Sequence, residues 1–300
     1  MNADSVKARL KKSAKESERL FQDELVIYCL ERTIYRISQS EYNENFTLKG
    51  GIFLYALFDG NFSRATRDID LLGRFMDNTI ETMREVFECI LSIKFDDAIV
   101  YDLKSISIKS ITEFKEFPGI NVTVTAMLDK TRVPISIDIG FGDVIYPERV
   151  IMDFPTLLDM EVPKIYAYSL SSVVAEKFEA IVSLGYANSR FKDFYDIYML
   201  IKSFNFDGKE LSKAIEETFR HRKTPLTDIV AFEDKFIGDR ERIARWNSFT
   251  NKKRTMSRFA FGTVVEGIKM FLVPIVESLN KKEIFELEWV SEISIWTKSM

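Results

Sequence analysis

The sequence predicts an α+β protein of two domains: a sheet domain at residues 1–166 that begins with a helix, and a helical domain at residues 167–300. The chain has 300 residues, of which 46% are hydrophobic. It is therefore long for one typical domain and apolar enough for two cores. Before Tyr166, several stretches alternate apolar and polar residues, which is the pattern of half-buried strands. After Tyr166, apolar residues recur every three or four positions, which is the pattern of amphipathic helices.

The predicted elements of the first domain follow one another along the chain. Apolar residues at helical spacing predict a helix from Leu20 to Ile37. In "FTLKGGIFLYALFDG" a pair of glycines opens a short apolar helix that Gly60 ends. "IDLLG" predicts a strand, and "DNTIETMREVFECILSI" predicts an amphipathic helix. Alternation predicts three further strands, in "SISIKSI", "INVTVTAML" and "VPISIDIGF".

The second domain is predicted to contain helices only. Four stretches have helical period: "YSLSSVVAEKFEAIVSLG", "SRFKDFYDIYMLIKSF", "KELSKAIEETFRHR" and "RFAFGTVVEGIKMFLVPIVESL". No strand is expected among them.

Composition and charge exclude several classes of protein. Charged residues make up 29% of the chain, as in globular proteins and unlike disordered ones. The two cysteines lie far apart without a CxxC pair, which supports neither a disulfide framework nor a zinc site. The longest apolar run, residues 259–276, contains Glu266, Lys269 and Pro274, which argues against a membrane span. The basic start of the chain lacks the apolar core of a signal peptide. We therefore expect a cytoplasmic protein with no membrane partner.

Three aspartates are the candidate catalytic residues and metal ligands. Asp68 and Asp70 are two apart on a predicted strand, so their side chains share a face. On "VPISIDIGF" the isoleucines form one face and Asp138 lies on the other. If both strands join one sheet whose isoleucine face is covered by helices, the three carboxylates converge on the opposite face. Such a cluster of oxygens requires a cation and suits Mg²⁺ or Mn²⁺. The alternative is that Asp68 pairs with Arg64 or Arg67 at the surface.

The residues Lys49, Gly50 and Gly51 predict a phosphate site. A glycine pair directly before a helix leaves backbone N–H groups and the positive end of the helix dipole facing an anion. Glycine also permits close approach of a triphosphate, and Lys49 adds a positive charge beside it. Together with Arg67, these residues are the candidates for binding an NTP. A simple tight turn is the alternative.

The helical domain offers further candidates. Lys177 lies on the apolar stripe of its helix, where it could face a triphosphate or extend along apolar surface to water. Asp193 and Asp196 are three apart and share one face of the next helix. They could instead pair with Arg190 and Lys192.

Four segments, in this order along the chain, carry a resemblance to a known family: "LKGGIFLYALFDGNFSRATRDIDLL", "ISIDIGFGD", "AEKFEAIV" and "RFKDFYDIYML". They resemble the AbiEii/AbiGii toxin family of nucleotidyltransferases, a branch of the DNA polymerase β-like superfamily that includes the MenT toxins. The resemblance covers the chain from Thr47 to Phe204. It implies a polymerase β-like nucleotidyltransferase sheet domain followed by a helical domain.

The resemblance also implies roles for individual residues. Asp68 and Asp70 match the metal-binding DxD, and Asp138 matches the third acidic residue. Lys177 matches the family lysine, and Asp193 or Asp196 matches the acidic residue of the fourth motif. The wider superfamily usually has Gly-Ser where this chain has Gly50-Gly51, so a serine contact to the phosphate is missing.

The expected activity is that of a nucleotidyltransferase toxin of a toxin–antitoxin or abortive-infection system. The resemblance implies transfer of NMP from an NTP to an RNA acceptor, with the 3′ end of tRNA favoured, and a cognate antitoxin as partner. The alternatives are a nucleotidyltransferase or kinase-like enzyme that modifies a small molecule or a protein, and a non-catalytic interaction protein.

The charge distribution supports a polyanionic acceptor. Residues 219–258 carry eleven Lys and Arg against five Asp and Glu, a net charge of +6 in a chain whose total is −4. Trp246 and Phe249 lie among these cations, where bases could stack on them. A solvated helical face is the alternative explanation of such a run.

Overall fold

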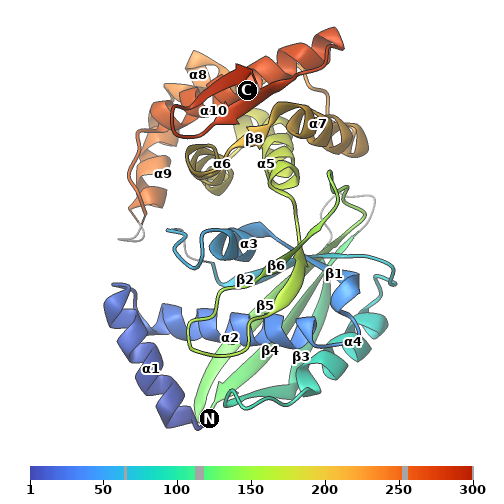
Figure 1. Ribbon diagram of the computed structural model, residues 1–300, viewed down its shortest axis with the longest axis vertical. Coiled ribbons are helices and arrows are strands. Elements are labelled where there is room, and N and C mark those ends of the chain that lie inside the picture. Colours follow the sequence, from blue (N-terminus) through green and yellow to red (C-terminus); the bar gives the residue numbers. More distant parts are fainter. Residues whose placement is uncertain (64–65, 112–117, 252–255, 299–300) are drawn as a thin grey trace. The chain divides into compact units, whose positions relative to one another are not determined.

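A computed structural model describes residues 1–63, 66–111, 118–251 and 256–298 of the chain (Figure 1). It divides into two compact units. The first comprises Met1–Asp143 and Arg149–Tyr168, and the second comprises Val144–Glu148 and Ser169–Met300. Among the described residues, no helix is both long enough and apolar enough to cross a membrane.

The first unit is built around a seven-stranded mixed sheet with the strand order β3-β4-β5-β2-β1-β7-β6. The pairs β2–β5 and β1–β7 are parallel, and the other pairs are antiparallel. The strands are β1 Phe46–Lys49, β2 Asp68–Gly73, β3 Ile99–Ile111, β4 Gly119–Leu128, β5 Thr131–Phe141, β6 Val150–Asp153 and β7 Lys164–Ala167. All four strands that the sequence predicts are confirmed. The four-residue strands β1, β6 and β7 were not predicted, because alternation cannot be recognised over so few positions.

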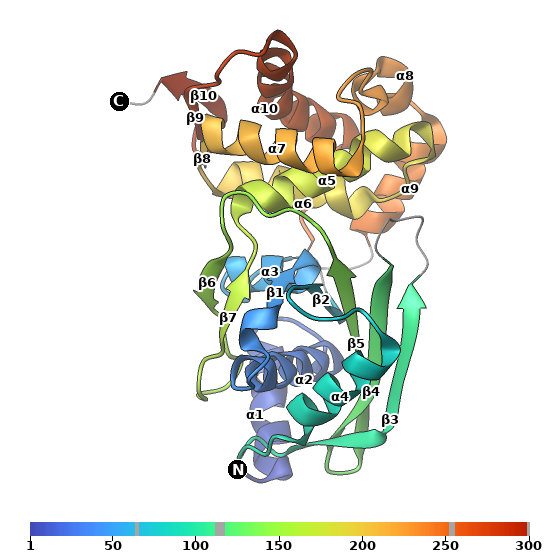
Figure 2. The same ribbon diagram turned by 90° about the vertical axis from the view of Figure 1, so that its right-hand side faces the viewer.

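Helices cover one face of this sheet. The helices of the unit are α1 Ala3–Glu16, α2 Phe21–Ser38, α3 Gly50–Leu57 and α4 Ile80–Ser92, with a 3₁₀ turn at Asn43–Asn45. Figures 1 and 2 show α2 and α4 on the same face, with α1 packed outside α2. Ile135, Ile137 and Ile139 of β5 are buried, whereas the intervening side chains are half-exposed. The isoleucine face is therefore the covered one, as the sequence predicts, and the aspartate face remains accessible to solvent.

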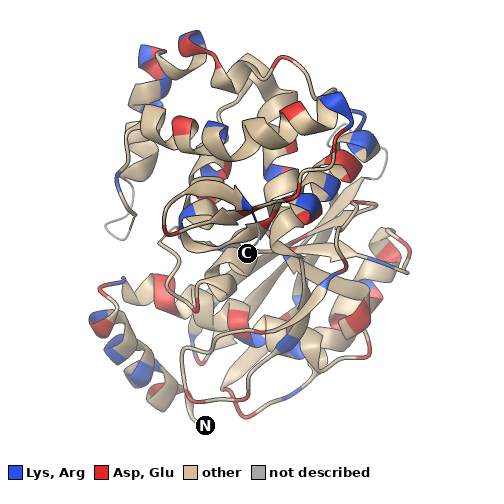
Figure 3. Cartoon of the chain, turned by 45° about the horizontal axis from the view of Figure 1, so that its top comes forward, with Lys and Arg blue, Asp and Glu red and all other residues tan. Residues whose placement is uncertain are grey.

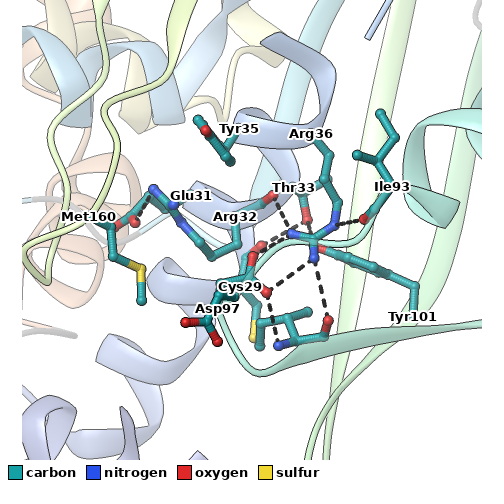
Figure 4. A network of polar contacts seen from close by, with 12 residues as sticks. Cys29, Glu31, Arg32, Thr33, Tyr35, Arg36, Ile93, Asp97, Tyr101 and Met160 are labelled. Carbon is teal, nitrogen blue, oxygen red and sulfur yellow. Dashed lines mark hydrogen bonds and ion pairs between the residues drawn. The ribbon is translucent and has the colours of Figure 1, made fainter. Parts of the chain in front are cut away.

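A buried ion pair ties α2 to the segment between α4 and β3 (Figure 4). Arg36 donates two hydrogen bonds to Asp97, with Nη1–Oδ2 at 2.6 Å and Nη2–Oδ1 at 3.1 Å. The same guanidinium donates to the carbonyls of Arg32, Ile93 and Ile99. Because both charges are almost completely buried, each depends on the other for compensation.

Glu31 and Arg32, one turn earlier in α2, form hydrogen bonds to the segment between β6 and β7. Glu31 Oε2 accepts a hydrogen bond from the backbone N–H of Leu157 at 2.7 Å, and its Oε1 lies 2.7 Å from Arg32 Nη2. Arg32 donates in turn to the carbonyl of Glu161 at 3.1 Å. Burial outweighs these contacts and raises the pKa of Glu31 to about 7.

The second unit is mainly helical. Its helices are α5 Leu170–Leu184, α6 Phe191–Ser203, α7 Gly208–Arg222, α8 Asp234–Ile237, α9 Arg240–Thr250 and α10 Phe261–Lys281, with 3₁₀ turns at Gly185–Ala187 and Val230–Phe232. The four predicted helices are confirmed as α5, α6, α7 and α10. The prediction that the domain contains no strand is wrong, because a small sheet of order β10-β9-β8 is present.

Aromatic contacts explain this small sheet. Its strands are β8 Phe206–Asp207, β9 Leu287–Val290 and β10 Ile295–Lys298. Trp296 stacks on Phe271 of α10, and Trp289 packs edge to face against the same ring. The indole N–H groups of Trp289 and Trp296 donate to the backbone carbonyls of Ile201 and Phe271, respectively. Side chains distant in sequence therefore stabilise strands that are too short to show a period.

Candidate active site

The sheet brings the three predicted carboxylates together. Strands β2 and β5 are parallel neighbours in which Asp70 lies opposite Asp138 and Asp68 lies opposite Ser136. One carboxylate oxygen of each aspartate lies within 4.8 Å of the others, and all three side chains are half-exposed. The predicted convergence of these residues is confirmed.

Each carboxylate of this cluster accepts a hydrogen bond from an uncharged donor. The bonds are Thr66 Oγ1 to Asp68 Oδ1 at 3.0 Å, Gly51 N to Asp70 Oδ2 at 3.3 Å, and Asn121 Nδ2 to Asp138 Oδ1 at 2.6 Å. Donors of this kind orient a carboxylate without neutralising it. These three contacts therefore leave in place the negative charge that would attract a divalent cation.

The alternative that Asp68 pairs with Arg67 is wrong, because Arg67 pairs with Asp23. Arg67 contacts Asp23 of α2 with Nη2 at 3.3 Å from Oδ1, and its side chain is 70% exposed. Its predicted contact with a nucleotide stays a prediction. The other proposed partner, Arg64, lies outside the described residues.

The glycine turn lies directly against the cluster. Gly50 has φ +68°, and a Cβ at this position would lie only 2.6 Å from the Cβ of Asp70. The turn opens α3, whose second residue, Gly51, points its N–H at Asp70. A backbone N–H of the predicted phosphate site and a carboxylate of the predicted metal site are therefore direct neighbours.

Lys49, the last residue of β1, makes an ion pair that the sequence did not indicate. Its Nζ lies 2.7 Å from Asp143 Oδ2 and 3.5 Å from the Tyr168 hydroxyl. Both members of the pair are mostly buried, at 16% and 10% exposure. Asp143 follows β5 in "GFGD", and only the fold places it beside Lys49.

The candidates of the second unit form a cluster of their own. Lys177 Nζ of α5 lies 3.1 Å from Asp193 Oδ1 and 2.7 Å from Asp196 Oδ2 of α6. Arg190 also contacts Asp193, with Nε at 2.7 Å from Oδ2. Burial raises the pKa of the Asp193 carboxyl, but the charges of Lys177 and Arg190 outweigh it and hold that pKa below its ordinary value. The alternative pairing of Asp193 with Arg190 is present, and Asp196 pairs with Lys177.

Comparison with known proteins identifies the family. The family model for the nucleotidyl transferase AbiEii toxin of type IV toxin–antitoxin systems matches residues 32–261, more than half of the chain. The chain belongs to the AbiEii family. No match was found among curated proteins.

Two solved structures from Helicobacter pylori are similar to this AbiEii protein. One, described as a nucleotidyltransferase, is 13% identical with a TM-score of 0.47 and covers 87% of this chain and 96% of its own. The other, JHP933, is 14% identical with a TM-score of 0.47 and covers 85% of this chain and 95% of its own.

The basic stretch of this AbiEii protein is partly used for its own folding. Arg222 contacts Glu176 and Glu179, and Arg242 donates to the carbonyls of Tyr186 and Asn188. Basic and acidic positions are interspersed on the helices (Figure 3). The remaining exposed cations in the described part of this stretch are Arg220, Lys223, Lys235, Arg240, Arg245 and Arg258.

The suggestion that bases stack on Trp246 is wrong. Its side chain is 0% exposed, and its indole N–H donates to the carbonyl of Phe259 at 2.8 Å. Phe249 packs against Trp246, Phe191 and Tyr195. These rings form the aromatic core of the helical unit, which the sequence alone could not distinguish from a surface platform.

Proposed function

We propose that this protein transfers a nucleoside monophosphate from an NTP to an RNA acceptor in a reaction that depends on a divalent metal ion. The main support for this proposal is the convergence of Asp68, Asp70 and Asp138 beside the Gly50-Gly51 turn. Membership of the AbiEii family implies an NTP substrate and a cognate antitoxin. The RNA acceptor, with the 3′ end of tRNA favoured, follows from the resemblance and from the charge of residues 219–258.

The donor set fits Mg²⁺ or Mn²⁺. These ions prefer carboxylate oxygens and usually keep several water molecules, which suits three half-exposed carboxylates on an open sheet face. Neither sulfur nor imidazole occurs among the described donors of the cluster, which disfavours softer metals. When bound, such ions would stabilise the attacking and the leaving oxygen of the in-line displacement.

The protein's own groups would then perform the remaining tasks. The acceptor hydroxyl oxygen forms a bond to the α-phosphorus, the bond from that phosphorus to the bridging oxygen breaks, and pyrophosphate leaves. Asp138 would accept the proton of the hydroxyl. The N–H groups at the start of α3 would bind the phosphate oxygens, as helix N-termini do for anions. Roles for Lys49, Arg67, Lys177 and either Asp193 or Asp196 in phosphate binding or catalysis remain predictions.

The experiment compares wild type with Asp70→Ala, using NTPs labelled at the α or the γ phosphate, with Mg²⁺ and total RNA. Transfer of the α label by the wild type, with release of pyrophosphate and loss in Asp70→Ala, is expected. Asp153→Asn is the control, since Asp153 is an exposed strand carboxylate of the same unit away from the cluster in sequence and strand order. Full activity of Asp70→Ala with unchanged thermal stability would reject the site.

The label also separates the alternative functions. Transfer of the γ label would indicate kinase chemistry, and α-label transfer to protein or small molecules would reject the RNA acceptor. Transfer of neither label would favour a non-catalytic interaction protein. Charge reversal of Lys252, Lys253 and Arg254, which lie outside the described residues, tests the acceptor surface. It should weaken RNA binding and flatten its salt dependence while NTP binding stays unchanged.

A further inference from the structure

We propose that Asn121 is a positioning residue that holds the carboxylate of Asp138 in the orientation required for binding a divalent cation. This inference rests on the proposed function and extends it to a residue that neither the sequence pattern nor the family resemblance singles out. Asn121 would act through Asp138 and would not itself contact the metal ion or the substrate.

The position of Asn121 follows from the sheet register. Strand β4 pairs with β5 in antiparallel fashion, and Asn121 is the direct partner of Asp138. On the other side of β5, Asp70 of β2 is also the direct partner of Asp138, and Lys49 of β1 follows as the partner of Asp70. On its other side, Asn121 is the direct partner of Lys109 of β3, so it lies within a row of five polar residues that crosses five neighbouring strands at one level.

The hydrogen bonds of Asn121 define its orientation. Its Nδ2 lies 2.6 Å from Asp138 Oδ1 and 2.8 Å from Ser136 Oγ. An ionised carboxylate only accepts hydrogen bonds, so the amide must direct its nitrogen, and not its oxygen, toward Asp138. The two N–H groups of one amide therefore bridge two residues on the same face of β5.

This contact restricts the carboxylate in a way that favours metal binding. Occupying one oxygen of Asp138 limits rotation of the carboxylate and leaves the other oxygen for a cation. An uncharged amide achieves this without cancelling the negative charge, as Lys or Arg would. Partners of metal ligands typically contribute about 10- to 100-fold in metal affinity or activity.

The direct test measures Mn²⁺ alone binding to the full chain, by electron paramagnetic resonance of the free ion, without nucleotide or RNA. Asn121→Leu removes the donor at similar size, and we expect its dissociation constant for Mn²⁺ to rise by about 10- to 100-fold. The matched control is Thr123→Val, two residues further on the same face of β4, where the hydroxyl donates to the carbonyl of Ser107. Its Mn²⁺ affinity should equal that of the wild type.

Kinetics provide a second readout. In Asn121→Leu the Mn²⁺ concentration for half-maximal transfer should rise by a similar factor, while the KM for NTP at saturating Mn²⁺ stays unchanged. A purely structural role of Asn121 would instead lower thermal stability without changing the Mn²⁺ affinity of the folded protein. If Asn121→Leu does not fold, Asn121→Ser, which is polar but too short to reach Asp138, is measured in its place.

The outcomes distinguish this inference from the proposed function. Unchanged Mn²⁺ binding in the folded Asn121 variant, with loss of binding in Asp70→Ala, would overturn the role of Asn121 and leave the metal site intact. Unchanged binding in Asp70→Ala would overturn the metal site itself, and the positioning role with it. Weakened binding in both variants, with normal binding in Thr123→Val, is the expected result.

Discussion

The backbone of Gly50 lies so close to Asp70 that a side chain at position 50 would overlap the carboxylate. A Cβ there would lie 2.6 Å from the Cβ of Asp70, and φ at Gly50 is +68°. The turn that starts α3 and the strand that carries the DxD pair are thereby fixed against each other. Gly50 in "LKGG" therefore supports the site because it has no side chain that would displace Asp70.

Gly50→Ala should therefore abolish transfer. The substitution forces Asp70 to move and also places a side chain at positive φ, which alone costs about 1 kcal/mol or more. Gly185→Ala is the matched control, because Gly185 also has positive φ but nothing lies within 4 Å of the added Cβ. Transfer assays and thermal unfolding should show loss of activity only at position 50. Normal activity of Gly50→Ala would show that Asp70 tolerates displacement.

The Lys49–Asp143 pair should behave as one unit in a double-mutant cycle. Removing one partner of a mostly buried pair weakens the compensation of the remaining charge, so Lys49→Met and Asp143→Asn should each lower the free energy of unfolding by up to about 3 kcal/mol. The double variant should lose clearly less than the sum of the two. Denaturant unfolding measures all four proteins. Additive losses would mean that the two side chains stabilise the turn independently.

The aspartate cluster could be predicted from the sequence because strand geometry determines it. Alternation assigns Asp68, Asp70 and Asp138 to one face of their strands, and the buried isoleucines identify the opposite face. Asn121 and Asp143 could not be predicted in this way. The role of Asn121 depends on the register of β4 against β5, and that of Asp143 depends on the path of a loop. Register and loop path come from pairing between distant segments and are not encoded in local periodicity.

The basic stretch shows a related limit of sequence reasoning. A count of charges in the sequence includes Arg222 and Arg242 as surface cations. In the structure, Arg222 forms ion pairs with Glu176 and Glu179, and Arg242 donates hydrogen bonds to backbone carbonyls. Only contacts between helices reveal which cations remain exposed for an acceptor.

Glu31 should make the stability of the protein depend on pH between about 4.5 and 7. Burial raises its pKa from 4.5 to about 7, so the folded state binds a proton in this range that the unfolded state releases. The contribution of Glu31 to stability is fully present below pH 4.5 and is lost as the pH rises through 7. A shift of this size corresponds to about 3 kcal/mol.

Denaturant unfolding of wild type and Glu31→Gln from pH 4.5 to 8 measures this contribution. The difference in unfolding free energy between the two proteins should change with pH across this window, because the amide of the variant cannot titrate. All other titrating groups are common to both proteins, so their contributions cancel in the difference. Glu41→Gln, at an exposed position, serves as the control and should parallel the wild type. A constant difference between wild type and Glu31→Gln would show that Glu31 remains ionised throughout, held by Arg32.

Lys177→Met should destabilise the helical unit, whatever part Lys177 takes in the reaction. Asp193 and Asp196 are 1% and 0% exposed, so removing the ammonium between them leaves buried negative charge and should cost about 3–5 kcal/mol. The pH dependence should also change sign. In the wild type the lowered pKa of Asp193 gives stability that is present at neutral pH and lost on acidification. Without Lys177, only Arg190 still contacts Asp193 among the cations described above, and burial favours the protonated carboxyl, so acidification toward pH 5 should restore part of the lost stability.

Lys192→Met on the exposed side of α6 is the matched control for this experiment and should unfold like the wild type at every pH. Thermal unfolding at pH 5 and pH 7.5, combined with transfer assays below the unfolding temperature, separates the two roles of Lys177. A Lys177→Met protein that keeps wild-type stability at both pH values but loses transfer would mean that this lysine serves the reaction and not the fold. Loss of stability at pH 7.5 that is partly recovered at pH 5 would show that the lysine is needed to compensate Asp193 and Asp196, so that lost activity alone could not identify it as catalytic.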